Sequence, residues 1–287
     1  MNINPPPPGI PLVLSAQPPV AKPVNRWRWW IHLLLLGSYI ILVGILGQEQ
    51  SAHRHVLALS LTPGGLLIVC TSGLCLFFLV LGLAVKVSRA SCDDLWLRWR
   101  RGLWPVAIGV VYSVALRFAI STIVSWVSLA LILSEVMTPQ SVQDFFASNR
   151  PSLEKLVDIS AMRENSLYFW LCLTVVSFVV AGLREELWRS AFLAGLRTLW
   201  PRRFDTPPGR VVAVALAAIL FAFAHLGMGL LTILIAGGLG FALGLIMVFH
   251  RSIWPAVITH GMFDATSLAL LPRLIETFHQ FQPPLGH

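Results

Sequence analysis

Seven apolar segments, most of them about as long as a bilayer is thick, constrain this chain more than any other feature. A helix needs about 20 apolar residues to cross the hydrocarbon core, and backbone polar groups in lipid must be satisfied within the segment. Charged residues make up 12% of the 287, against about 25% in a soluble domain, and the mean hydropathy is +0.75. These features predict an all-α, polytopic transmembrane helix bundle with about seven to eight membrane helices. The segments are 29–47, 64–85, 104–133, 167–199, 211–225, 230–249 and 253–271.

Three of these segments differ from the standard length. Segments 104–133 and 167–199 are longer than a span requires, so we expect them to be tilted, kinked or protruding. A break in either one would add the eighth helix. Segment 211–225 is short for a span.

The basic residues alternate between loops and predict the topology. Lys and Arg gather before the first segment and in the second, fourth and sixth loops, which predicts that the N-terminus and these loops are cytoplasmic. We therefore interpret the net charge of +8 as a topology signal and not as a nucleic-acid surface. The predicted location is an integral position in the bacterial cytoplasmic (inner) membrane.

Ionisable side chains interrupt three of the apolar segments. A charge in hydrocarbon is costly, so such groups tend to be paired, to face the protein interior and to be functional. At 1.5 Å per residue from the nearest predicted cytoplasmic arginine, the three places lie about 18, 22 and 13 Å deep. These similar depths predict one shared polar cavity. The residues are Glu185, Glu186 and Arg189 in the first place, His225 in the second, and His260 and Asp264 in the third.

The spacing within the motifs suggests which groups pair. On a helix, Arg189 can reach Glu185 at i,i+4 or Glu186 at i,i+3. Adjacent residues point about 100° apart, so we expect one glutamate to face the cavity and the other to be held in place. Asp264, four residues after His260, can accept a hydrogen bond from its imidazole and fix the tautomer.

A carboxylate and two histidines are suited to activating water. A carboxylate in a low-dielectric site can act as a general base, and the histidines can polarise the water, stabilise an oxyanion or bind a metal. Hydrolysis of a peptide bond fits this set. Taken singly, the Glu-Glu-x-x-Arg motif could be a structural ion pair and His225 a packing residue. Arg117 has no partner in its own segment and is given no role.

The three motifs, in this order, resemble the CPBP intramembrane protease family, which includes the CAAX prenyl endopeptidases and bacterial self-immunity relatives. Its pattern is Glu-Glu-x-x-x-Arg, then Phe-x-x-x-His, then His-x-x-x-Asn or Asp, and here "EELWR", "FAFAH" and "HGMFD" match it. The resemblance implies an intramembrane endopeptidase that cleaves near the cytoplasmic side. It implies catalytic roles for Glu185, Glu186, His225, His260 and Asp264, and supporting roles for Arg189 and Phe221.

Two departures from the family pattern leave questions open. The arginine comes one residue early, so the base is either Glu185 or Glu186. An ionised Asp264 cannot donate to an oxyanion, although it can orient His260 or bind a metal. Both a zinc mechanism, with His225, His260 and Glu185 as ligands, and a metal-free glutamate mechanism are compatible with the sequence.

The sequence also leaves rival functions open. A proton-coupled transporter or channel could use the same residues as a relay, although no convincing internal repeat supports it. A non-catalytic immunity or scaffold protein on the same fold is the other alternative. The expected partners are the lipid bilayer and a protein or peptide substrate, lipid-modified or membrane-anchored, with no nucleic acid.

The chain is predicted to divide into five parts. The core that resembles the family is flanked by helices without a signature. "GGLGFALG" within this core, with Gly240 and Gly244 four residues apart, indicates close packing between helices of this chain more than a dimer face. The parts are a disordered proline-rich tail (1–25), N-terminal membrane helices (26–134), an external loop with room for a surface helix (135–166), the catalytic membrane helices (167–272) and a C-terminal tail (273–287).

Overall fold

A computed structural model describes residues 25–50, 61–99, 102–149 and 157–280. These residues contain helices and no strand, which confirms the all-α prediction. Five helices are long and apolar enough to cross a membrane, so the chain is an integral membrane protein. A shorter apolar helix lies at Pro207–Phe223.

Each of the seven predicted segments is helical. The predicted N-terminal tail (1–25) lies outside the described residues except for residue 25. The predicted C-terminal tail (273–287) does not begin where the last helix ends, because residues 273–280 continue α12 and only 281–287 lie outside the described residues. The elements are α1 (Arg26–Gln50), α3 (Pro63–Ser88), α4 (Trp104–Leu133), α5 (Pro139–Asn149), α6 (Ile159–Glu164), α7 (Ser166–Leu171), the π-helix η2 (Cys172–Leu183), α8 (Arg184–Leu199), α9 (Pro201–Phe204), α10 (Pro207–Phe223), the 3-10 turn η3 (Leu226–Met228), α11 (Leu230–His250) and α12 (Trp254–Gln280).

Helix starts follow from local sequence. The Thr62 hydroxyl accepts a hydrogen bond from the Gly65 amide and caps α3. Thr206 caps α10 in the same way, and proline follows at the first helical position in both cases. A proline there sacrifices no hydrogen bond, because the first amides of a helix have no partner within it.

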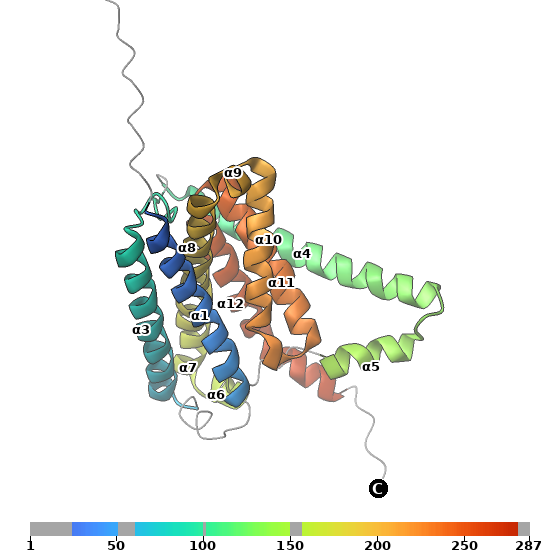
Figure 1. Ribbon diagram of the computed structural model, residues 1–287. Coiled ribbons are helices and arrows are strands. Elements are labelled where there is room, and N and C mark those ends of the chain that lie inside the picture. Colours follow the sequence, from blue (N-terminus) through green and yellow to red (C-terminus); the bar gives the residue numbers. More distant parts are fainter. Residues whose placement is uncertain (1–24, 51–60, 100–101, 150–156, 281–287) are drawn as a thin grey trace, which may run out of the picture.

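Helix α8 lies at the centre of the bundle (Figure 1), and every residue from 186 to 196 is buried. Two contacts fix α1 against it. His32 lies with Nε2 2.9 Å from the Ala191 carbonyl oxygen, and the Trp188 indole donates to the Leu36 carbonyl at 3.0 Å. A buried helix flanked by polar contacts of this kind is a rigid support for side chains.

The segment that precedes α8 is π-helical. In η2 the Ser177 hydroxyl donates to the carbonyl of Cys172, five residues back, at 3.0 Å. η2 also packs closely on α12. A Cβ at Gly182 would lie 3.0 Å from the Val257 carbonyl oxygen, and one at Gly261 would lie 2.3 Å from the Phe178 ring. π-helical turns often occur at functional sites, and this one leads directly into the two glutamates.

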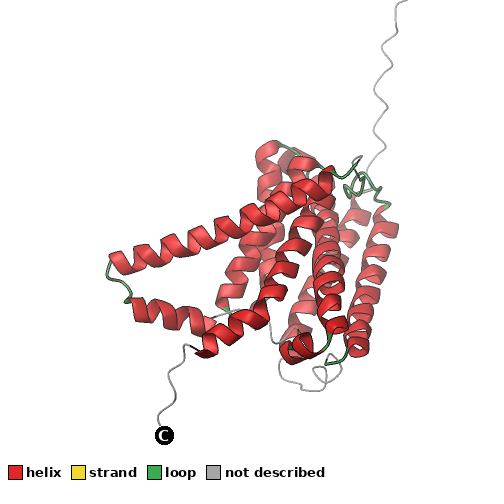
Figure 2. Ribbon diagram, turned by 180° about the vertical axis from the view of Figure 1, so that it is seen from behind, coloured by secondary structure: helices red, strands yellow, loops and turns green. Residues whose placement is uncertain are grey.

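Helix α4 leaves the bundle along its length. Figures 1 and 2 show its far end projecting away from the other helices, and α5 running from there back toward them. This agrees with the prediction that a 30-residue segment would be tilted, kinked or protruding. The predicted third loop carries two short helices, α5 and α6.

Candidate active site

The buried centre of the site is an ion pair on α8. Glu186 and Arg189, three residues apart, are both fully buried, and Nη1 of Arg189 contacts Oε1 of Glu186. Nε and Nη2 of Arg189 have no hydrogen-bond partner within the described part of the chain. The ring of Phe221 lies against the guanidinium, 4.9 Å from Cζ to the ring centroid. Charge and ring contact therefore hold this arginine in place.

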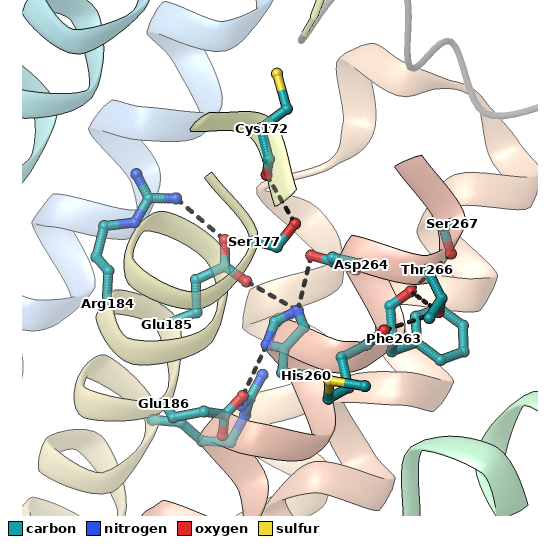
Figure 3. A network of polar contacts seen from close by, with 12 residues as sticks. Cys172, Ser177, Arg184, Glu185, Glu186, His260, Phe263, Asp264, Thr266 and Ser267 are labelled. Atoms are coloured by element: carbon teal, nitrogen blue, oxygen red, sulfur yellow. Dashed lines mark hydrogen bonds and ion pairs between the residues drawn. The ribbon is translucent and has the colours of Figure 1, made fainter. Parts of the chain in front are cut away.

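His260 of α12 lies among three carboxylates (Figure 3). Its Nδ1 is 3.1 Å from Oε1 of Glu186, and because a carboxylate oxygen accepts, Nδ1 is the donor. Nε2 lies 3.7 Å from Oε2 of Glu185 and 3.6 Å from Oδ2 of Asp264. Both distances exceed a direct hydrogen bond. The structure thus brings together four of the five predicted catalytic residues, two from α8 and two from α12.

The two adjacent glutamates have different surroundings. Oε1 of Glu185 accepts a hydrogen bond from Nη2 of Arg184 at 3.1 Å, and its Oε2 points toward His260 (Figure 3). Its side chain is 16% exposed, whereas that of Glu186 is completely buried. Glu186 is thus the glutamate that is held in place, as predicted for one of the two, and Glu185 is the one that stays partly exposed.

His225 lies just beyond its helix and not within it. α10 ends at Phe223, and His225 follows in the turn before η3, so the predicted span to residue 225 is too long. Its Nδ1 donates to the Phe221 carbonyl at 2.9 Å, which leaves Nε2 as the accepting nitrogen. The rings of Phe221 and His225 lie 4.7 Å apart. Phe221 therefore contacts both His225 and Arg189.

The structure brings His225 near the other groups without making a metal site. It lies close enough to Asp264 to interact with it electrostatically. Within the described residues, no three His, Cys, Asp or Glu side chains are placed so that they could hold a metal ion. The predicted ligand set of His225, His260 and Glu185 does not fit a metal ion in this arrangement.

Three contributors to the site are not among the predicted site residues. Arg184 pairs with Glu185, and only its place next to the motif indicated it. Arg117 of α4 contacts α12, and a lone arginine in an apolar segment was its only signal. Gly240 lets the side chains of Phe221 and Arg189 lie close to α11, because a Cβ there would lie 3.1 Å from the Phe221 ring and 3.3 Å from Nη2 of Arg189.

The glycine pair of α11 packs within the chain as predicted. Gly240 faces Phe221 of α10, and a Cβ at Gly244 would lie 2.6 Å from Val214, also of α10. Small residues at this spacing let two membrane helices approach closely. The approach brings α10, and with it Phe221, against α8.

Comparison with known families identifies the segment that carries this geometry. Residues 166–266 match the family model described as type II CAAX prenyl endopeptidase Rce1-like. The match confirms the resemblance to CPBP proteases and implies a membrane endopeptidase. It covers the elements from α7 to α11 and the first half of α12. A comparison with curated proteins gives no match, and neither does a comparison with solved structures.

Proposed function

We propose that this chain, with its Rce1-like segment at residues 166–266, hydrolyses a peptide bond within the membrane by means of water activated by Glu185. The observation that carries the proposal is the difference between the two glutamates. Glu186 is fully buried and paired with Arg189, so it is suited to support. Glu185 is partly accessible and keeps Oε2 directed at His260, so it is suited to take a proton from the water that attacks the substrate.

The proposed chemistry requires a water between Glu185 and His260. Oε2 of Glu185 and Nε2 of His260 are 3.7 Å apart, and one water at about 2.8 Å from each can contact both. Glu185 takes a proton as the water oxygen attacks the carbonyl carbon. The C–N bond then breaks, and the same carboxyl returns the proton to the leaving amine.

His260 and Asp264 complete the proposed site. Glu186 holds Nδ1 of His260, so the ring presents Nε2 to the substrate. When Nε2 carries a hydrogen, it can donate it to the developing oxyanion. Asp264, 3.6 Å from Nε2, orients the ring from the opposite side.

The substrate we propose is a protein or peptide anchored in the membrane. The site lies on membrane-spanning helices, so the scissile bond has to reach it at the bilayer. A prenylated C-terminal segment is one such substrate, and it is the class that the family description names. The predicted basic cytoplasmic loops would attract anionic headgroups, and cleavage near the cytoplasmic side remains part of the proposal.

The experiment compares variants of the purified chain in nanodiscs against peptides with a C-terminal prenylcysteine and matched peptides without it. We expect Glu185→Gln to lower kcat by about 10²–10⁴-fold, while the melting temperature stays near the wild-type value. Cleavage should survive treatment with a chelator. Full activity of the Glu185→Gln protein would overturn the role of Glu185. Loss of cleavage on chelation, restored by zinc, would overturn the metal-free mechanism.

A further inference from the structure

Arg117 of α4 contacts the α12 turn that begins with Phe263. Its Nη2 donates to the Phe263 carbonyl at 2.6 Å, to the Thr266 hydroxyl and to the Ser267 hydroxyl at 3.2 Å. The guanidinium also lies over the Phe263 ring, 4.5 Å from its centroid. A planar fork with several donors suits such a set of acceptors.

Arg117 stands at the point where α4 leaves the bundle. The buried residues of α4 are Pro105, Gly109 and Ser113, at a spacing of four, and Arg117 continues that stripe. The stripe faces α12, because the Thr259 hydroxyl donates to the Gly109 carbonyl at 3.1 Å. Beyond residue 117 no residue of α4 is buried. Figures 1 and 2 show this half of the helix apart from its neighbours.

The contacted turn is the one that carries the site. Phe263 precedes Asp264, and His260 lies one turn earlier on α12. The side chains at 266 and 267 also donate to the Phe263 carbonyl, so Arg117 joins a group of donors on this one oxygen. Moving the carbonyl would move Asp264 with it.

Arg117 also supplies a positive charge near the third carboxylate of the site. Glu185 pairs with Arg184 and Glu186 pairs with Arg189. Asp264 is the third carboxylate, and Arg117 is a cation that acts on it electrostatically. Three carboxylates and three guanidinium groups thus balance in a medium where an uncompensated charge is costly.

We propose that Arg117 is a positioning residue: it clamps the Phe263 carbonyl and the adjacent hydroxyls so that Asp264 and His260 keep their alignment with Glu185. The clamp comes from α4, outside the segment that matches the family. This inference rests on the proposed function, because its effect on rate requires that His260 and Asp264 act in cleavage.

The test compares Arg117→Met and Arg117→Lys with the control Tyr112→Phe. The control removes a contact from α4 to α11, Tyr112 Oη to His250 Nε2 at 3.2 Å, and leaves α12 untouched. We expect Arg117→Met to lower kcat by about 10–100-fold, because misplacement of about 1 Å has such an effect, with KM nearly unchanged. Arg117→Lys should be intermediate and Tyr112→Phe close to wild type. A rise in KM alone, or an equal loss of kcat in the control, would overturn the proposal.

A double-mutant cycle separates positioning from general support. In an Asp264→Asn background, Arg117→Met should cost less than about threefold in kcat, because the two changes act as a unit. Equal losses in both backgrounds would overturn the proposal. The same double-mutant cycle can be measured through melting temperatures, which require no substrate. If no peptide is cleaved, the proposed function fails, while non-additive melting temperatures still support the clamp and additive ones refute it.

Discussion

The fully buried pair of Glu186 and Arg189 makes a strong prediction about stability. Arg189→Met keeps a long, flexible side chain and removes the cation. Among the described residues, Glu186 then remains buried with His260 as its polar contact, and the Phe221 ring loses the guanidinium above it. Removing one partner of a buried ion pair typically costs about 3–5 kcal/mol, because the other charge is left uncompensated.

That loss converts to a measurable shift in melting temperature. At about 2–4 °C per kcal/mol for a chain of this size, Arg189→Met should melt about 6–20 °C below wild type. The assay is thermal unfolding of the purified chain in one fixed detergent, followed by intrinsic tryptophan fluorescence. Arg98→Met is the matched control, since it breaks the exposed Asp93–Arg98 pair. Such a pair is worth about 0–1 kcal/mol.

A rescue experiment tests the stated cause. If the uncompensated charge of Glu186 produces the loss, then adding Glu186→Gln to Arg189→Met should recover more than half of the lost melting temperature, because a neutral amide needs no counter-charge. Two results would refute the reasoning. One is a shift in Arg189→Met no larger than in the Arg98→Met control, and the other is a double variant that melts lower still.

Two further substitutions test the packing around the site. Gly261→Ala should destabilise by about 1–3 kcal/mol, because its Cβ would lie 2.3 Å from the Phe178 ring. Gly82→Ala should not destabilise the chain, because a Cβ there would meet open space. Equal melting temperatures for the two variants would contradict the close approach of η2 and α12. Ser190→Val should cost about 1–3 kcal/mol, because it leaves the buried carbonyl of Leu95 without the hydroxyl that now donates to it. A wild-type melting temperature would show that this bond contributes nothing.

Hydropathy predicted the helices because the bilayer imposes a length on each of them. The seven apolar segments all became helical, and matched depth correctly predicted that Glu185 and Glu186 would meet His260 and Asp264. The end of α10 was misplaced, since the helix stops at Phe223. Apolar residues alone do not mark a helix end, and the turn through His225 is set by the ring and carbonyl contacts with Phe221.

The π-helical segment could not be predicted from its residues. "CLTVVSFVVAGL" is uniformly apolar, and its β-branched residues suit an α-helix in a membrane as well as a π-helix. Its register depends on contacts that are distant in the chain. Gly182 approaches the backbone of Val257, and Gly261 approaches Phe178. The π-helical segment is therefore associated with these long-range contacts and not with a local sequence pattern. It leads into α8, where Glu185 and Glu186 both lie close to His260.

The site depends on helices that carry no family signature. α1 contacts α8 through His32 and Trp188, and α4 contacts α12 through Arg117. Neither α1 nor α4 belongs to the matched segment, 166–266. The family pattern therefore contains the groups that we propose to act, whereas α1 and α4 contribute contacts that hold the helices carrying those groups. Changes in α1 and α4 should accordingly alter rates and melting temperatures even though these helices contribute none of the proposed catalytic residues.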